Sequence, residues 1–403
     1  MANGPLNAAP SSMHMKIAMI GQKGIPTQYG GIEKHVEALA VRLGAAGHDV
    51  TVYTRRWYAA PRARFSRGVR TVAVPTVQSK HLDAIVHTFF ASLHALKSRA
   101  DIYHYHGVGP ALLSWMPRLF APRAKVVVTF HCIDRKHQKW GMFARLMLGI
   151  GERAAALFPH ETITVSRTLQ SYVRDRYDRD ARYIPNGIDT PPARIGTDLL
   201  KRWSLTRGGY VVMVSRLVRH KGAHHLIRAY ADLRRRGAHA GKKLVIVGDS
   251  AFTDDYVREL RALAEGIPGV VFTGYLQGRA LQQVFAGAFA VVHPSESEGL
   301  PIAVLEAMAY GKCVLASDIP ENMEVIRQHG MSFRNKSVPD LSRKLRALLS
   351  SPWLAAEIGA KAKDYVLEQY HWDDVATETD RLYAEKAPDR TVNLTLTKKT
   401  LKA

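Results

Sequence analysis

Short runs of β-branched and aromatic residues alternate with longer segments of helical periodicity along most of the chain. Many of the short runs are apolar at consecutive positions, so both of their faces are suited to burial. Strands of this kind, separated by helices, favour a parallel sheet that helices cover on both sides. A first group of strands is predicted over residues 16–21, 49–54, 70–75, 102–107, 125–131, 161–166 and 182–187.

A second group of strands follows a polar, proline-bearing stretch at residues 186–198, which is a candidate linker. These strands are predicted over residues 210–215, 243–249, 270–274, 289–295 and 312–318. The pattern predicts an α/β fold of two doubly wound Rossmann-like domains that face one another across a cleft. The expected divisions are a disordered leader (1–14), a first domain (15–192), a second domain (193–370), a helix crossing back to the first domain (371–387) and a basic tail (388–403).

Composition fits a globular protein without a membrane span. The chain has 403 residues, 46% of them hydrophobic, which is enough for two domains with their own cores. No apolar run reaches the ~18 residues that suggest a membrane span, and the start lacks the features of a secretory signal. The two cysteines, Cys132 and Cys313, are too few for a disulfide framework and lack metal-ligand spacing. We therefore expect a cytoplasmic protein.

The charge is strongly basic and unevenly distributed. The net charge is +22, and residues 1–195 carry +15 of it, with 27 Lys and Arg against 12 Asp and Glu. Such a face attracts nucleic acid, anionic lipids and pyrophosphate-bearing substrates, whereas a solvated basic surface without a specific partner has the same charge. Segments 115–125 and 135–150 mix cations with Trp, Phe, Leu and Met, as interfacial helices and helices packed on a sheet both do. An anionic membrane surface is therefore a candidate partner, with a peripheral location on the inner face of the cell membrane.

A glycine-rich turn follows the first predicted strand, in the segment GQKGIPTQYGGIEKHVEALAVRL (21–43). The pair Gly30 and Gly31 permits close backbone approach just before a helix, and exposed amides at such a helix start bind phosphate. The spacing is not G-x-G-x-x-G, and the second strand ends in Arg55 and Arg56 without an acidic residue that would hold an adenosine ribose. Both departures argue against a dehydrogenase.

Histidines gather at the ends of two later strands of the first half. His104 and His106 share one face of a strand, and the next strand ends at His131. A histidine at the carboxyl end of a strand can hydrogen-bond a ligand rich in hydroxyl groups, so His131 and His106 are candidates for the cleft and His104 is assigned a structural role. The group is a poor metal set because no carboxylate or cysteine accompanies it at ligand spacing.

The second half carries two cations and two glutamates that suggest an anionic ligand. Arg216 and Lys221 flank a turn after a strand, where they could clamp a diphosphate or form a solvated basic loop. In the segment SESEGLPIAVLEAMAYGKCVLAS (295–317), Glu306 lies among apolar residues about one and a half turns into a helix that has Pro301 in its first turn. A carboxylate buried in that company needs a partner, either a ribose diol or a buried cation. Glu298, outside the helix, could reach a transferred group.

Taken together, these segments resemble the family 4 glycosyltransferases, the large retaining group with the GT-B fold, over about residues 15–386. The most specific part is the E-x7-E element from Glu298 to Glu306, followed by Ala307-Met308-Ala309 and Gly311. Its support lies in the order and spacing of SRLVRHKG (215–222), ITVSRTL (163–169), YIPNGID (183–189), VIVGDS (245–250) and FTGYL (272–276). The stretch GIPTQYGGIEKHVEALA (24–40) is also similar to a subgroup that contains bacterial rhamnosyltransferases.

The resemblance implies roles in a donor site for residues of both halves. Arg216 and Lys221 match residues that bind the donor diphosphate, Glu306 matches the residue that holds the ribose, and Glu298 matches the one that contacts the donor sugar.

Six further positions complete the implied site. His131 matches the histidine beside the reacting sugar, and Gly30 and Gly31 match the glycine pair near the donor phosphates and the acceptor. The base rests on backbone around Tyr275 and Leu276, and His106 is placed on the acceptor side.

The chain departs from the family pattern after Glu298. Many members have Phe-Gly after the first Glu-Gly, where this chain has Leu300-Pro301. Proline removes one potential amide donor to the donor phosphates or sugar, whereas Gly299 and Leu300 keep theirs.

The implied activity is a hexosyltransferase-type transfer with retention at the anomeric carbon. The donor would be a UDP-, dTDP- or GDP-linked sugar, and the acceptor a hydroxyl of a glycan or polyprenyl-diphosphate-linked molecule in cell-surface polysaccharide assembly. No cofactor and no obligatory metal are expected, because Asp178-Arg179-Asp180 lies in a charged, helix-like run and does not form a DxD-type site.

Two other functions remain open from the sequence. A sugar-nucleotide 2-epimerase shares the two-domain architecture and would turn over the donor without an acceptor. A nucleic-acid-binding protein would exploit the charge, although the chain lacks the aromatic stacking pattern of such proteins, and we expect no nucleic-acid partner.

Overall fold

The computed structural model describes residues 13–58, 65–66, 68–77, 79, 82–133, 135 and 142–385. Most of the predicted leader, the predicted tail (388–403) and part of the segment 135–150 lie outside the described residues.

The first half is built on a sheet of eight strands in the order β3-β4-β2-β1-β5-β6-β7-β8. Only the pairing of β3 with β4 is antiparallel among the described pairs, and the parallel remainder agrees with the both-faces-apolar pattern of the sequence. The strands are β1 (Lys16–Ile20), β2 (Asp49–Arg55), β3 (Phe65–Ser66), β4 (Val69–Val74), β5 (Ile102–His106), β6 (Lys125–Phe130), β7 (Glu161–Thr164) and β8 (Arg182–Tyr183).

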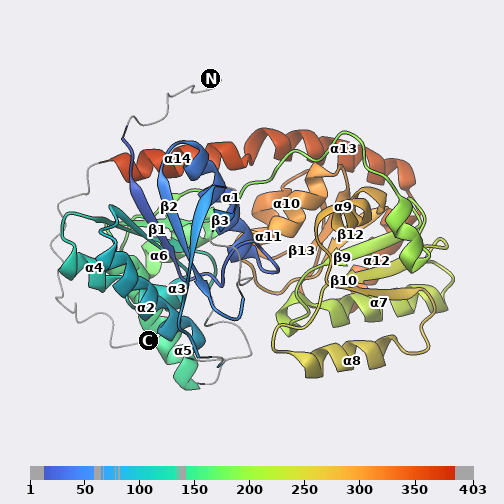
Figure 1. Ribbon diagram of the computed structural model, residues 1–403. Coiled ribbons are helices and arrows are strands. Elements are labelled where there is room, and N and C mark those ends of the chain that lie inside the picture. The colour runs from blue at the N-terminus through green and yellow to red at the C-terminus, as the bar shows by residue number, and fades with distance from the viewer. Residues whose placement is uncertain are drawn as a thin grey trace.

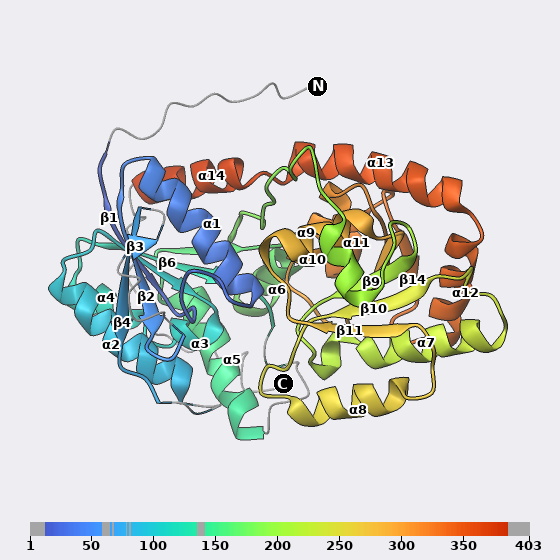
Figure 2. The ribbon, with the colours of Figure 1, turned by 45° about the vertical axis from the view of Figure 1, so that its right-hand side comes forward.

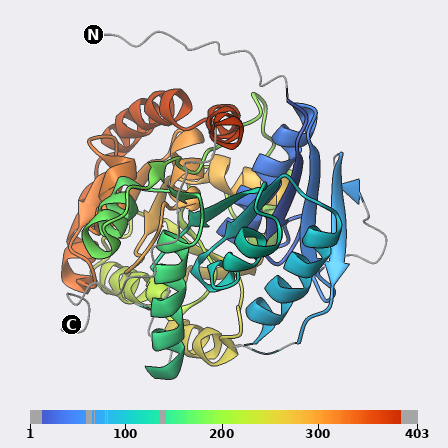
Figure 3. The same ribbon diagram turned by 90° about the vertical axis from the view of Figure 1, so that its left-hand side faces the viewer.

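Helices cover both faces of this sheet because alternate residues of its strands face opposite ways. In β1, Ile17 and Met19 pack into a core with α1 and the chain's last helix, whereas Ala18 and Ile20 pack into the core under α2. Figure 3 shows the blue α1 and red α14 on one side and the cyan and teal helices on the other. The helices of this half are α1 (Gly31–Ala45), α2 (Asp83–Lys97), α3 (Val108–Ala111), α4 (Trp115–Phe120), α5 (Met142–Leu157) and α6 (Arg167–Tyr177).

The second half is a parallel sheet of six strands in the order β11-β10-β9-β12-β13-β14. Its strands are β9 (Tyr210–Val214), β10 (Lys243–Val247), β11 (Val270–Gly274), β12 (Ala290–His293), β13 (Cys313–Ser317) and β14 (Met331–Phe333). Its helices are η2 (Asp198–Trp203), η3 (Arg219–Lys221), α7 (Ala223–Arg235), α8 (Asp254–Ala264), α9 (Gly278–Gly287), α10 (Ile302–Ala309), α11 (Pro320–Ile326), α12 (Val338–Leu349) and α13 (Pro352–Gln369). The short strand β14 and the long helix α13 were not among the predicted elements.

The last helix of the described residues, α14 (Trp372–Ala384), lies on the first half although it follows the second half in sequence. Figures 1 and 2 show α13 along the second half and α14 continuing the same path over the first. The change of side is fixed where His371 forms a β-bridge with Ile188 and where Trp372 is buried beside α1. Farther along α14, Asp380 accepts a hydrogen bond from His48 at 2.9 Å.

Candidate active site

The glycine turn after β1 requires glycine for steric reasons. Gly30 has φ of +114°, and a Cβ there would lie 1.9 Å from Glu33 Oε2. The other oxygen of that carboxylate accepts a hydrogen bond from the backbone N–H of Lys23 at 3.1 Å, which closes the turn on itself. Helix α1 then begins at Gly31, so its first amides lie at the carboxyl edge of the sheet.

Four buried histidines meet at the carboxyl ends of β5 and β6. His106 Nδ1 and His131 Nε2 lie 3.3 Å apart. His104, which the sequence assigned a structural role, lies between the Tyr383 hydroxyl at 2.6 Å and the Thr129 hydroxyl at 2.7 Å. Burial, followed by the neighbouring imidazoles, lowers the pKa of His106 and His131 well below the usual range, so both rings are neutral at pH 7.

The fourth histidine, His35 on α1, was missed by the sequence interpretation. Its ring lies 4.8 Å from that of His131, and its Nδ1 lies 2.9 Å from Asn186 Oδ1. Because Asn186 Nδ2 donates to the carbonyl of Leu300 at 2.9 Å, Asn186 Oδ1 is an acceptor and His35 Nδ1 carries the proton. Asn186 therefore links the histidine cluster to the second half. The helical periodicity that places His35 on the buried face of α1 is the signal that could have found it.

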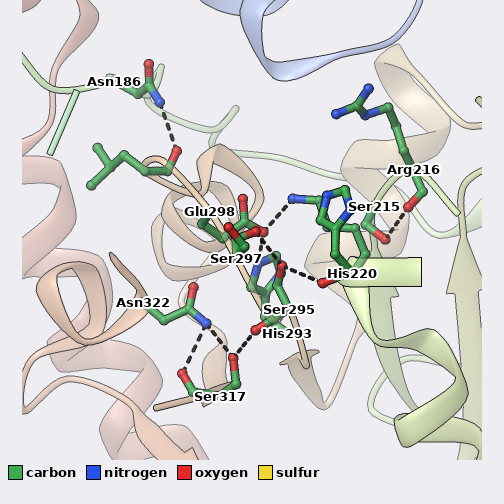
Figure 4. A network of polar contacts seen from close by, with 12 residues as sticks. Asn186, Ser215, Arg216, His220, His293, Ser295, Ser297, Glu298, Ser317 and Asn322 are labelled. Carbon is green, nitrogen blue, oxygen red and sulfur yellow. Dashed lines mark hydrogen bonds and ion pairs between the residues drawn. The ribbon is translucent and has the colours of Figure 1, made fainter. Parts of the chain in front are cut away.

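In the second half, Glu298 is the centre of a buried charge network at the carboxyl end of β12. Its Oε1 accepts from Lys221 Nζ at 2.5 Å and from His293 Nε2 at 2.8 Å. Burial raises the pKa of the Glu298 carboxyl, but the Lys221 charge and His293 outweigh that effect and hold the pKa well below its usual range. Figure 4 shows this network, with the Arg216 side chain extending away from it. The two cations predicted to form one clamp are thus differently engaged, since Lys221 is already paired with a carboxylate.

Glu306 is placed differently from the sequence interpretation. Its neighbours on α10 are buried, but Glu306 lies on the other side of the helix with 20% of its side chain exposed. Its Oε1 forms an ion pair with Nζ of Lys34, which belongs to the first turn of α1 in the first half. Glu306 is thus half-buried and paired with a cation, whereas the sequence interpretation placed it among buried residues, because the helical period turns it toward the first half.

The two halves touch at several predicted positions. A Cβ at Gly299 would lie 1.6 Å from the His131 carbonyl oxygen, so only glycine permits this approach. On α1, a Cβ at Gly31 would lie 3.9 Å from Ile302 at the start of α10, after the N-cap residue Pro301. Farther out, Tyr275 packs edge to face against Tyr29, with ring centroids 6.4 Å apart, while Leu276 packs against the core. The structure thus brings glycine, histidine and glutamate positions from both sheets to one place.

Two side-chain groups among the described residues have the composition of a metal site. Ring nitrogens of His35, His106 and His131 lie within 4.8 Å of one another, and the second group consists of His224, His225 and Glu296. In the first group, the direct contact between His106 and His131 is that of two hydrogen-bonded neutral imidazoles.

Comparison with known proteins gives family matches to both halves. The family described as Glycosyltransferase Family 4 matches residues 29–191, and the family described as Glycosyl transferases group 1 matches residues 202–365. An uncharacterized glycosyltransferase of Methanocaldococcus jannaschii is 27% identical over 395 residues, which are 92% of this chain and 98% of that protein. A GDP-mannose-dependent alpha-(1-6)-phosphatidylinositol monomannoside mannosyltransferase of Mycobacterium tuberculosis is 28% identical over 396 residues, covering 90% of this chain and 97% of that protein.

Solved structures agree in fold. Sucrose-phosphate synthase from Thermosynechococcus elongatus superposes with a TM-score of 0.79 and 21% identity, covering 92% of this chain and 98% of that one. Anabaena HepE in complex with UDP and glucose superposes with a TM-score of 0.75 and 20% identity, covering 92% and 99%. The predicted GT-B arrangement of two Rossmann-like domains is confirmed.

Proposed function

The chain belongs to the family 4 and group 1 glycosyltransferases, and from that premise we propose that it moves a sugar from a nucleoside diphosphate to an acceptor hydroxyl. The proposal rests chiefly on one observation. The glycine turn that begins α1, the Glu298–Lys221 pair and the half-buried Glu306 of α10 all lie where the two halves meet. A cleft edge with free helix amides, cations and a carboxylate can hold the phosphates and ribose of one nucleotide.

The donor would lie mainly on the second half. Glu306 would accept hydrogen bonds from the ribose hydroxyls, and Arg216 and Lys221 would face the diphosphate. The amides of Gly299 and Leu300 at the start of α10 would add uncharged donors. The base would rest on backbone near Tyr275 and Leu276, and Gly30 and Gly31 would close on the phosphates from the first half.

The chemistry we propose is transfer with retention by attack on the face that the diphosphate leaves. The bond between the anomeric carbon and the diphosphate oxygen breaks, and the acceptor oxygen forms the new bond as its proton passes to the departing diphosphate. Arg216 and Lys221 would stabilise the charge that develops on the leaving group, which is the main catalytic contribution in this scheme. His131 and Glu298 would line the sugar, His106 would lie on the acceptor side, and no divalent ion is required.

Two similar proteins have names that specify a nucleotide, and a third nucleotide, dTDP, is expected from the sequence resemblance. HepE was solved with UDP, and the mycobacterial relative uses GDP-mannose. We propose that this chain takes a sugar linked to UDP, GDP or dTDP. Activity toward rhamnose is a narrower prediction that rests on the resemblance of residues 24–40.

For the acceptor we propose a glycan or lipid-linked molecule presented at an anionic membrane in cell-surface polysaccharide assembly. Exposed apolar side chains gather on three helices of the basic first half. They include Phe89, Phe90 and Leu93 on α2, Trp115, Leu119 and Phe120 on α4, and Leu146, Met147 and Ile150 on α5. The contact we propose is peripheral. Within the described residues no helix is long and apolar enough to span a membrane.

The test is a thermal-shift screen of UDP-, GDP- and dTDP-sugars, followed by turnover with and without acceptor. A bound donor raises Tm because it stabilises the folded state. Glu306→Ala should remove most of the shift, and Glu368→Ala, an exposed glutamate on α13, should keep it. The proposal fails if no nucleotide sugar shifts Tm, or if the donor is converted to an epimer without any acceptor.

A further inference from the structure

Lys34 joins the two halves through an ion pair at the candidate donor site. It belongs to the first turn of α1, and its Nζ forms an ion pair with Oε1 of Glu306 on α10. The side chain of Lys34 is 36% exposed, so it is accessible to solvent where the two halves meet and is not sealed in the core.

The acidic residues around Lys34 on α1 are occupied within their own half. Glu33 accepts from the backbone of Lys23, and Glu37 accepts from the backbone of Thr27 at 2.8 Å. The starts of α1 and α10 also approach one another, since a Cβ at Gly31 would contact Ile302. Lys34 therefore has Glu306, in the second turn of α10, as its carboxylate partner, on the helix near which the donor is expected.

Charge balance suggests a need for this lysine. Of the two cations assigned to the diphosphate, Lys221 also balances the charge of the buried Glu298, so the pair and Arg216 together offer only one net positive charge besides the helix amides. A bound nucleotide also places its ribose on Glu306, whose Oε1 is the atom that Lys34 contacts. The ribose hydroxyls and Lys34 would then compete for one carboxylate.

We propose that Lys34 is a donor-binding residue. When the ribose of the donor hydrogen-bonds to the Glu306 carboxylate, Lys34 leaves Glu306 and pairs with the donor diphosphate. This inference rests on the proposed function and adds to it a cation from the opposite domain. A lysine suits the exchange because its ammonium is a compact charge on a flexible stem, and because phosphates adjacent to the ribose offer it a stronger anion. Donor binding would thereby hold the two halves together through the ligand.

The experiment measures the binding of UDP and GDP by calorimetry, and of uridine and guanosine by saturation-transfer NMR, to the wild type and to Lys34→Met. The variant should bind the diphosphate about tenfold more weakly, as expected for loss of one charge-assisted contact. It should bind the matching nucleoside as well as the wild type or better, because Glu306 has lost its competitor. Lys34→Arg should retain most of the diphosphate affinity. Lys97→Met, an equal charge change on the exposed end of α2, should leave both affinities unchanged.

A second measurement separates contact with the phosphates from support of Glu306. In a Glu306→Gln background, Lys34→Met should still weaken diphosphate binding about tenfold if Lys34 touches the phosphates. The inference is overturned if that effect vanishes, if nucleoside and diphosphate lose affinity equally, or if Lys34→Met changes nothing. If the wild type itself binds neither nucleotide, the proposed function is wrong, and the inference about Lys34 is wrong as well.

Discussion

At the scale of single residues, the site contains buried charged side chains, and specific hydrogen-bonding and ion-pair partners stabilise their charged forms. Glu298 is buried, and its charged form persists because Lys221 and His293 both donate to the same oxygen. Such a network is sensitive to the loss of one member, since the remaining charge is left without compensation.

Glu298→Gln should therefore lower the free energy of unfolding by about 2 kcal/mol at pH 7. The pKa of Glu298 in the folded protein lies below its unfolded value of about 4.3, so the stabilisation is complete above that pH and is lost as the pH falls toward the folded value. Urea unfolding at pH 7 and at pH 4 should show a smaller difference between variant and wild type at the lower pH. A difference independent of pH would show that the carboxylate charge is not the cause.

Gly299 is a second residue at which a small change should have a large effect. A methyl group there would overlap the His131 carbonyl and force the two halves apart, so Gly299→Ala should reduce donor affinity and lower stability by about 1–3 kcal/mol. Gly149→Ala is the matched control, because it adds a methyl group on α5 into open space and should slightly raise Tm. Equal Tm values for the two variants would contradict the steric argument.

At the scale of elements, α14 ties the segment that follows the second half to the first half. Trp372 is 1% exposed, and its ring lies 5.5 Å from that of His35, so the helix start supports the histidine cluster. Lys125 also donates to the carbonyl of Glu385 just past the helix, at 2.8 Å.

Trp372→Ala should lower the free energy of unfolding by about 3–5 kcal/mol, as loss of a buried aromatic side chain does. It should also reduce turnover, because His35 loses the ring against which it packs. Trp353→Ala on α13 is the control, since that indole is 69% exposed and its loss should change stability little. Urea unfolding and initial rates measured on both variants would check the prediction, which is wrong if the two behave alike.

At the scale of the whole molecule, charge and apolar surface coincide on the first half. That half carries most of the net positive charge, and Figures 1 and 2 show α2, α4 and α5 grouped on its lower side. Basic surface with exposed Phe, Trp and Leu is typical of proteins that bind anionic bilayers from one side.

We predict that the protein sediments with vesicles containing anionic lipid and that binding weakens as salt rises, because exposed charges are screened. Leu119→Ser together with Phe120→Ser, which are 65% and 62% exposed, should reduce binding about tenfold or more without altering Tm. Trp353→Ser, an exposed residue of the second half, should leave binding unchanged. Sedimentation that is indifferent to lipid charge and salt would contradict the prediction.

Much of this molecule could be predicted from local sequence because the decisive signals are local. Runs such as residues 125–130 are apolar on both faces. Such a short run predicts a strand buried between helices without any information from distant parts of the chain. The pair Glu298 and Glu306, with Pro301 between them, likewise indicates a loop followed by a helix. The predicted strands of both sheets and the two-domain fold follow from such patterns. The three-residue strand β14 carries too short a pattern to be found.

Tertiary structure alone decided which of these residues meet. Lys34 and Glu306 are 272 positions apart, and the sequence around either residue does not predict their contact. Two other contacts depend in the same way on how two separately packed sheets face one another. They are the approach of Gly299 to His131 and the hydrogen bond from Asn186 to the Leu300 carbonyl. Hydrophobic periodicity is a property of each segment, whereas partners across a cleft are set by the packing of whole domains. The sequence therefore determined the elements and the candidate residues, and the fold determined their pairing.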